Sequence, residues 1–179
     1  MLKRVSAKLP DIDLKNVFDS FILAQIRYGL AVYGRLSSDK NRTVGRNLES
    51  LQVLVNNVLR YMSGIRKTDK IKVTDLLNEA NVLSVEQICA QELISMAWNT
   101  LKYGQNQLQH FIKEKKPESG LVLRSQARGD LIIKNHKNKY LVTTTAARLF
   151  NKCSVNIKNY KDHDKIPKDA IKHYVKNNL

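Results

Sequence analysis

One segment constrains the fold of this chain more than any other: LESLQVLVNNVLRYMSG at 48–64. Its apolar residues recur at steps of three and four, the period that places side chains along one side of an α-helix. Asn47 can cap the start of this helix, and Gly64 suits the left-handed residue that ends one. The apolar stripe consists of Leu48, Leu51, Leu54, Val55, Val58, Leu59 and Met62. Because such a stripe must pack against a partner, the segment predicts a helical core.

Two further segments have the same period and predict two more long helices. Segment 14–33 reads as a mostly buried helix, and segment 85–103 follows the capping-box signature Ser84-Val-Glu-Gln87. Thr74 is expected to cap a short helix at 75–81 that precedes it. We expect the three long helices to form a bundle. The side chains expected to fill its middle are Leu93, Ile94, Met96 and Trp98.

The pattern changes beyond residue 104. The charged stretch 113–120 contains Pro117 and Gly120, which break regular structure, so we expect a helical bundle at 1–112, a linker at 113–120 and a basic C-terminal subdomain at 121–179. The predicted fold class is therefore mainly α.

The C-terminal subdomain is expected to combine a short β hairpin with two short helices. Its apolar runs 121–123 and 131–133 flank a turn at Arg128-Gly129-Asp130. Helical spacing returns at 144–152 and at 168–177, where Pro167 stands just before the second helix.

Net charge gives the first indication of function. The chain has 31 Lys and Arg against 16 Asp and Glu, a formal charge of +15. Residues 1–104 hold fifteen basic and ten acidic side chains, whereas residues 105–179 hold sixteen and six, a net of +10 in the shorter part. Such an excess indicates a polyanionic partner. The alternative is that the lysines only keep the protein in solution.

Catalytic, metal-binding and targeting patterns are missing from the sequence. No phosphate loop, dinucleotide fingerprint or paired Cys/His spacing occurs, and Asp162-His163-Asp164 reads as a solvated loop, so we expect neither an enzyme, a metal nor a cofactor. Cys89 and Cys153 lie in helical pattern and are expected to be buried, reduced thiols. No apolar run reaches a membrane span and no secretory signal occurs, so an intracellular protein, nuclear or cytoplasmic, is expected.

Basic residues interleaved with aromatic ones suggest a nucleic-acid interface, with phosphate contacts from the cations and stacking from an exposed ring. Tyr140 and Phe150 are the aromatic candidates; the alternative is that both belong to the core. Gln52 and Arg60 lie off the apolar stripe of 48–64 and are candidates for contacts outside the core. The predicted nucleic-acid-binding residues are Arg60, Arg124, Arg128, Lys134, Lys137, Lys139, Arg148 and Lys152. Arg128-Gly129-Asp130 is interpreted as a turn rather than an adhesion motif.

The order of several segments resembles a known family. These are IRYGLAVYG, LESLQVLVNNVLRYMSG, LLNEANVLSVEQ, LRSQARGDL and TTTAARLFNKC, followed by a terminal helix. Together they resemble the C-terminal region of non-LTR (LINE-type) retrotransposon reverse transcriptases. The matching positions are Tyr28-Gly29, Tyr33-Gly34, Gln52, Leu59-Arg60, Gly64, Leu83-Ser84-Val85, Arg124-Ser125 and Leu149-Phe150-Asn151.

The chain departs from that family at defined places. Phe150 stands where the family usually has Trp, and Lys152-Cys153 where it has Leu-Pro. The aromatic-x-Asp-Asp motif of a polymerase palm is missing, as are the Cys/His knuckle and acidic cluster of a C-terminal endonuclease. The resemblance thus implies a non-catalytic module that handles RNA or an RNA–DNA duplex, with the polymerase part of a retroelement protein or a second copy as a possible partner.

A protein-interaction or oligomerisation scaffold is the alternative function. Such a scaffold needs an exposed apolar patch, for which Tyr28, Tyr33 and Val44 are the candidates.

Overall fold

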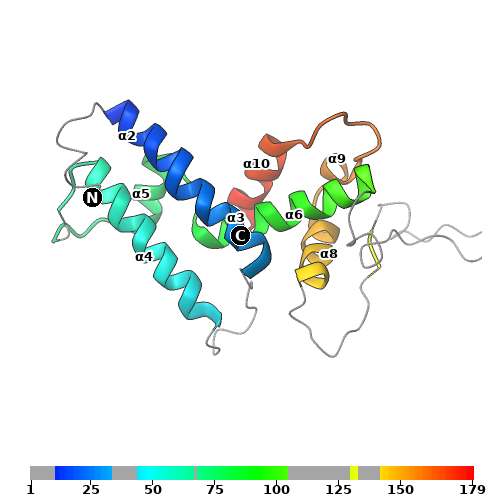
Figure 1. Cartoon of the computed structure of the whole chain (residues 1–179), viewed down its shortest axis with the longest axis horizontal. Coiled ribbons are helices and arrows are strands. Elements are labelled where there is room, and N and C mark those ends of the chain that lie inside the picture. The colour runs from blue at the N-terminus through cyan, green and yellow to red at the C-terminus, as the bar shows by residue number, and fades with distance from the viewer. Residues whose placement is uncertain (1–10, 34–43, 67, 105–129, 133–141) are drawn as a thin grey trace, which may run out of the picture. The chain divides into compact units, whose positions relative to one another are not determined.

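The computed structural model describes residues 11–33, 44–66, 68–104, 130–132 and 142–179 (Figure 1). These residues are mainly helical, which confirms the predicted fold class. The chain divides into two compact units, Met1–Ile88 and Cys89–Leu179. Within the described ranges, no helix is both long and apolar enough to cross a membrane. The predicted linker at 113–120 and most of the predicted hairpin lie outside these ranges.

The first helical segment contains a π-helical turn that changes which residues are buried. α2 (Asp11–Val17), the π-helix η1 (Phe18–Leu23) and α3 (Ala24–Tyr33) follow one another without a break. In an uninterrupted α-helix Leu23 would point about 140° away from Phe18. The wider π turn returns Leu23 to the buried side with Phe18, and both are at most 4% exposed.

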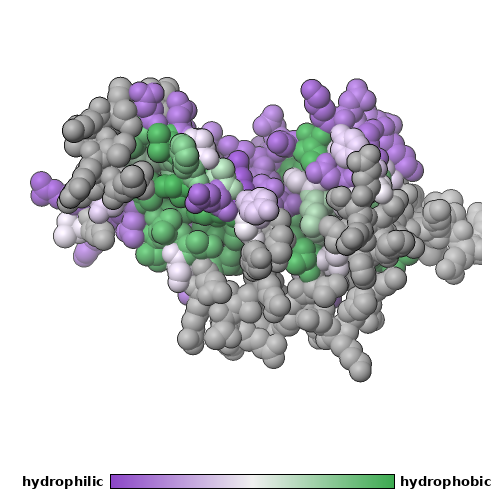
Figure 2. Space-filling view, viewed as in Figure 1, coloured by the Kyte–Doolittle hydropathy of each residue, from purple (hydrophilic) through white to green (hydrophobic). Residues whose placement is uncertain are grey.

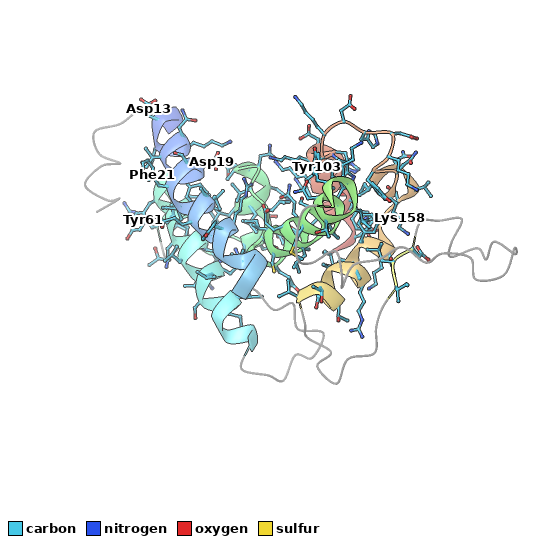
Figure 3. All side chains as sticks on the ribbon, turned by 45° about the vertical axis from the view of Figure 1, so that its right-hand side comes forward. Asp13, Asp19, Phe21, Tyr61, Tyr103 and Lys158 are labelled. Atoms are coloured by element: carbon cyan, nitrogen blue, oxygen red, sulfur yellow. The ribbon has the colours of Figure 1, made fainter. Side chains whose placement is uncertain are left out.

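The same turn overturns the expectation that this segment is mostly buried. Phe21 lies in the segment predicted to be mostly buried, yet its side chain is 66% exposed (Figure 3). Tyr28 is 88% exposed. The π turn is the physical reason for Phe21, because it places Leu23 rather than Phe21 against the core.

α4 (Val44–Met62) is the helix predicted at 48–64. Val55, Val58 and Leu59 are buried, and α2 and α5 both pack against α4. Hydrophobic residues gather where α2 and α4 meet (Figure 2). The helix begins at Val44, so Asn47 lies inside its first turn and the predicted cap is wrong. Leu54 is 47% exposed although it belongs to the predicted stripe.

Both glycine and asparagine end helices of this unit in the left-handed conformation. Gly64 has φ +65°, as predicted for the residue that follows α4. α5 (Val73–Glu79) is followed by Asn81, with φ +52°. Thr74 does not cap α5, because the helix begins at Val73 and Lys72 occupies the cap position.

α6 (Val85–Tyr103) has the predicted bounds and the predicted capping box. The Ser84 amide donates to Gln87 Oε1 at 3.1 Å, and the Gln87 amide donates to Ser84 Oγ at 3.2 Å. The helix begins in the first unit and continues into the second. Its predicted core residues Leu93, Ile94 and Trp98 are buried, whereas Met96 is only half-buried.

The second unit packs three C-terminal helices with the second part of α6. α8 (Val142–Lys152) and α10 (Lys168–Asn178) correspond to the predicted helices, and Pro167 occupies the cap position of α10. α9 (Val155–Lys158), a single turn, was not predicted. Among the described residues of this unit, the buried apolar side chains are Cys89, Ala90, Leu93, Ile94, Ala97, Trp98, Leu131, Ala146, Ala147, Phe150, Cys153, Ile157, Ile171 and Val175.

Candidate nucleic-acid interface

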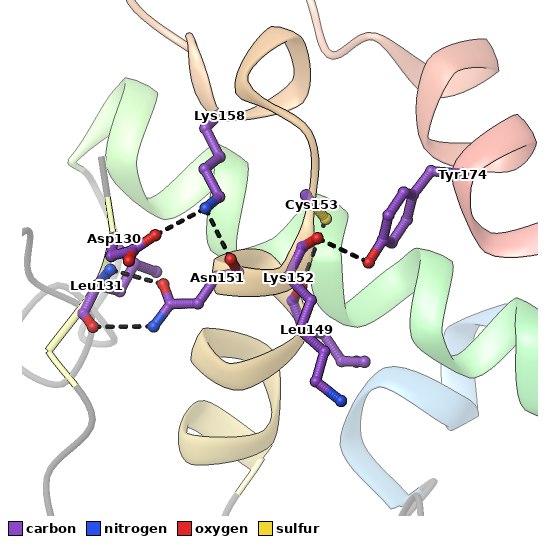
Figure 4. Close-up of polar contacts among 8 residues, drawn as sticks. All are labelled: Asp130, Leu131, Leu149, Asn151, Lys152, Cys153, Lys158 and Tyr174. Carbon is purple, nitrogen blue, oxygen red and sulfur yellow. Dashed lines mark hydrogen bonds and ion pairs between the residues drawn. The ribbon is translucent and has the colours of Figure 1, made fainter. Parts of the chain in front are cut away.

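A buried ion pair lies where α8 ends and α9 begins (Figure 4). Lys158 Nζ is 2.7 Å from Asp130 Oδ1, and the two side chains are only 5% and 11% exposed. Lys158 Nζ also donates to the carbonyl oxygen of Asn151 at 2.7 Å, one of the orphan carbonyls at the end of α8. The pair therefore joins segment 130–132, α8 and α9.

The side chain of Asn151 binds the backbone of segment 130–132 through two hydrogen bonds. Its Oδ1 accepts from the Leu131 amide at 2.6 Å, and its Nδ2 donates to the Leu131 carbonyl at 3.0 Å. This pattern satisfies both backbone groups of a residue that is fully buried. Asn151 thus holds Leu131, which directly follows the predicted turn at Arg128-Gly129-Asp130.

The last turn of α8 is held from two more sides. The Tyr174 hydroxyl of α10 donates to the Lys152 carbonyl at 2.9 Å, and Cys153 Sγ donates to the Leu149 carbonyl at 3.4 Å. Burial raises the pKa of the Cys153 thiol to about 12, with the Lys158 ammonium acting in the opposite direction. Burial, and secondarily Cys153, raise the pKa of Tyr174. The end of α8 is therefore a rigid platform with neutral thiol and phenol groups at neutral pH.

Arg148 and Lys152 are the predicted binding residues that this platform presents. They lie four residues apart, so both point to one side of α8, and both are exposed. Neither cation has an ion-pair partner in the described part of the chain. The Lys152 side chain extends away from Tyr174 (Figure 4). Phe150 lies between them in sequence but is fully buried, so it belongs to the core and offers no stacking surface.

The other predicted cations of the second unit lie outside the described residues. They are Arg124, Arg128, Lys134, Lys137 and Lys139, together with the aromatic Tyr140. Asp130, the last residue of the Arg-Gly-Asp tripeptide, is buried by its pair with Lys158. Its carboxylate is therefore unavailable to an adhesion receptor.

Arg60 and Gln52, in the first unit, make structural contacts. Arg60 Nη1 donates to the carbonyls of Arg66 and Asp69 at 3.1 and 3.2 Å, and Nη2 donates to that of Ile71 at 3.4 Å. The guanidinium thereby holds the connection between α4 and α5. Contact of Arg60 with nucleic acid stays a prediction.

Gln52 joins α4 to the start of α6. Its Oε1 accepts from the Val85 amide at 2.7 Å, which satisfies one of the orphan amides at the start of that helix. Its Nε2 donates to Asn56 Oδ1 at 2.8 Å. Gln52 was predicted to contact a group outside the core. In the structure it caps α6 instead, through the Val85 amide, which lies 33 residues further along the chain.

The acidic cluster at 162–164 has the surroundings of a surface loop. Asp162 and Asp164 are exposed, Asp162 accepts from the Asn159 side chain, and His163 Nε2 is 3.2 Å from the Asn156 carbonyl. Among the described residues, no group of His, Cys, Asp and Glu could hold a metal ion.

Sequence reasoning missed the network of Asp130, Asn151 and Lys158. Its members lie 20 and 28 residues from their partners in the chain, and no local spacing predicts such contacts. No family model, no curated protein and no solved structure matches this chain.

Proposed function

We propose that this chain is a non-catalytic nucleic-acid-binding module that holds RNA or an RNA–DNA duplex through its phosphates. One observation carries the proposal: Arg148 and Lys152 are exposed, without ion-pair partners in the described structure, on a helix whose end is held by a buried ion pair and by a hydrogen bond from Tyr174. Because the backbone that carries these cations is already ordered, their binding to phosphate costs side-chain entropy but little backbone entropy. The net charge of +10 in residues 105–179 supplies a field of the same sign around them.

The resemblance to retrotransposon reverse transcriptases supports the same proposal. It implies handling of template or target during reverse transcription, inside the cell and beside a polymerase that this chain lacks. In the motif Leu149-Phe150-Asn151, Phe150 is fully buried and Asn151 binds the Leu131 backbone. We expect this motif to have the same structural role, packing and backbone binding, in the family that the chain resembles. We also propose that the three long helices form a bundle and that a subdomain with a short hairpin follows it.

The decisive measurement is the salt dependence of binding. Fluorescence anisotropy with labelled RNA, single-stranded DNA and an RNA–DNA duplex between about 50 and 200 mM salt should show a steep loss of affinity, because each bound phosphate releases counterions. The double variant Arg148→Gln/Lys152→Gln should lower the magnitude of the log–log slope by about 1.4 on the single strands and by a larger amount, up to about 1.8, on the duplex.

Two controls separate this mechanism from a general loss of charge. Lys15→Gln/Lys70→Gln removes the same charge from exposed positions of the first unit and should leave the slope unchanged. Arg148→Lys keeps the charge at its site and should retain most of the affinity. A wild-type affinity that does not respond to salt would refute the proposed function.

Exposed apolar side chains favour a second candidate function, that of a protein-interaction scaffold. In the first unit Phe21 is 66% exposed, Tyr28 88%, Val53 57% and Tyr61 44%. Figure 3 shows Phe21 and Tyr61 projecting from the segments that carry them. Light scattering across a concentration series would detect self-association, and Phe21→Ser/Tyr28→Ser should abolish it. A monomer at every concentration, together with salt-sensitive RNA binding, would leave only the first function.

A further inference from the structure

Three lysines form a stripe along α10. Lys168, Lys172 and Lys176 recur every four residues, so they lie on neighbouring turns of one helix face. Lys168 and Lys176 are exposed, and Lys172 is half-buried. The helix itself is fixed by Ile171 and Val175, both fully buried, so the stripe is presented by a packed element.

This stripe faces away from the α8 platform. At about 100° per residue, Tyr174 lies roughly 160° around the helix from Lys172. The Tyr174 hydroxyl reaches the carbonyl of Lys152, so the Tyr174 side of α10 is the side that meets the end of α8. In Figure 1, α8 and α10 lie on different sides of the second part of α6. Arg148 and Lys152 therefore belong to a different surface from the lysines of α10.

The lysine stripe opposes the stability of its own helix. Lysines four residues apart repel each other, and Lys168 places a positive charge in the first turn, where the helix dipole favours a negative one. The acidic residue of that turn is Asp169, yet none of the three lysines has an ion pair with it or with any other described residue. A polyanion bound along the stripe would relieve both repulsions.

The chemistry of the stripe indicates phosphate contact without base recognition. Lysine is a flexible point charge that suits phosphate oxygens rather than the planar edge of a base. Of the two ring-bearing side chains of α10, Tyr174 is engaged with α8, and the His173 ring lies 3.2 Å from the Asn177 side-chain nitrogen. Tyr103 holds the approach to α10, because its hydroxyl donates to the Asp164 carbonyl at 3.2 Å.

We infer that α10 carries a second phosphate-backbone surface, so that one chain holds two nucleic-acid segments at once, one at α8 and one at α10. This inference rests on the proposed function, because it extends the same electrostatic mechanism to another face. The two surfaces point apart, so one short straight duplex cannot occupy both. Two duplexes bound to the same chain are brought together.

Stoichiometry tests the inference directly. Titration of the full chain with a 10-bp RNA–DNA duplex at about 50 mM salt, where phosphate contacts are strong, should give two duplexes per chain. Lys168→Gln/Lys172→Gln/Lys176→Gln should give one, and Arg148→Gln/Lys152→Gln should also leave one. Donor- and acceptor-labelled duplexes should show energy transfer with the wild type and lose it with either variant. Lysine-to-arginine replacement at the three α10 positions should preserve both results.

Each contrary result has a definite meaning. One duplex per wild-type chain, lost in the α8 variant, would overturn the second surface while the proposed function stands. Two duplexes that persist in the α10 variant would overturn the assignment to α10. If that variant instead loses binding to vesicles of phosphatidylserine while keeping both duplexes, the stripe serves a membrane surface and the inference fails. No binding of any nucleic acid by the wild type would remove the proposed function as well.

Discussion

Replacement of Asp130 by Asn should destabilise the second unit strongly. The substitution keeps the shape of the side chain but leaves the Lys158 ammonium, whose side chain is 5% exposed, without its counter-ion. Removing one partner of a buried pair costs about 3–5 kcal/mol, because the remaining charge stays desolvated. Lys158→Met should lower the free energy of unfolding by a similar amount, because it removes the counter-ion of the Asp130 carboxylate. Either loss is a large part of the roughly 5–15 kcal/mol that stabilises a typical domain.

The double variant Asp130→Asn/Lys158→Met should recover much of that loss. It removes both charges, and it leaves the Asn151 carbonyl without the donor that Lys158 Nζ supplies at 2.7 Å in the wild type. An unsatisfied acceptor of this kind costs about 1–3 kcal/mol. The double variant should therefore be more stable than either single variant, and the coupling between the two substitutions should amount to several kcal/mol.

Trp98 provides the assay for this cycle. It is the sole tryptophan of the chain, it is fully buried, and it lies in the second unit with the ion pair. Urea unfolding followed by its fluorescence gives the free energy of unfolding for the four proteins. Lys165→Met, at an exposed position, is the control and should change stability by less than about 0.5 kcal/mol. If the loss in the free energy of unfolding of the double variant equals the sum of the two single losses within about 0.5 kcal/mol, the two residues are not coupled and the reasoning is refuted.

Two further predictions concern single residues. Gln52→Leu should expose the Val85 amide to faster hydrogen exchange, whereas Gln52→Glu keeps an acceptor and should preserve protection; equal exchange in both would contradict the cap. The free energy of unfolding should fall as pH rises from about 9 towards about 12, because the Cys153 thiol ionises in the unfolded chain before the folded one. The raised pKa of Tyr174 has the same sign, and Cys153→Ser should flatten the slope; an unchanged slope would refute the assignment.

Local chemistry is the part of this protein that its sequence determines. The bounds of α6 follow from the Ser84–Gln87 capping box and from Gly104, whose φ is +61°, because caps and left-handed residues act within one helical turn. The burial of Val55, Val58 and Leu59 follows from the helical period for the same reason, whereas Leu54 of the same stripe is 47% exposed. Cys89 and Cys153 are both buried and neither forms a disulfide, as their place in helical pattern indicates.

Only the tertiary structure decides which polar and apolar groups meet across the chain. The π turn at Phe18–Leu23 overrides the α-helical period, so Phe21 is exposed while Leu23 is buried. Gln52 and Arg60 lie off the apolar stripe of their helix, and their hydrogen bonds to distant amides and carbonyls depend on how α4 packs.

The candidate interface shows the same division. The sequence indicates Arg148 and Lys152 as cations of one helix face, because a four-residue spacing is local information. The sequence contains no signal that Lys158, by contrast, is buried. Its burial depends on tertiary packing, because a lysine can be desolvated only where packing brings it a carboxylate and a carbonyl, here those of Asp130 and Asn151.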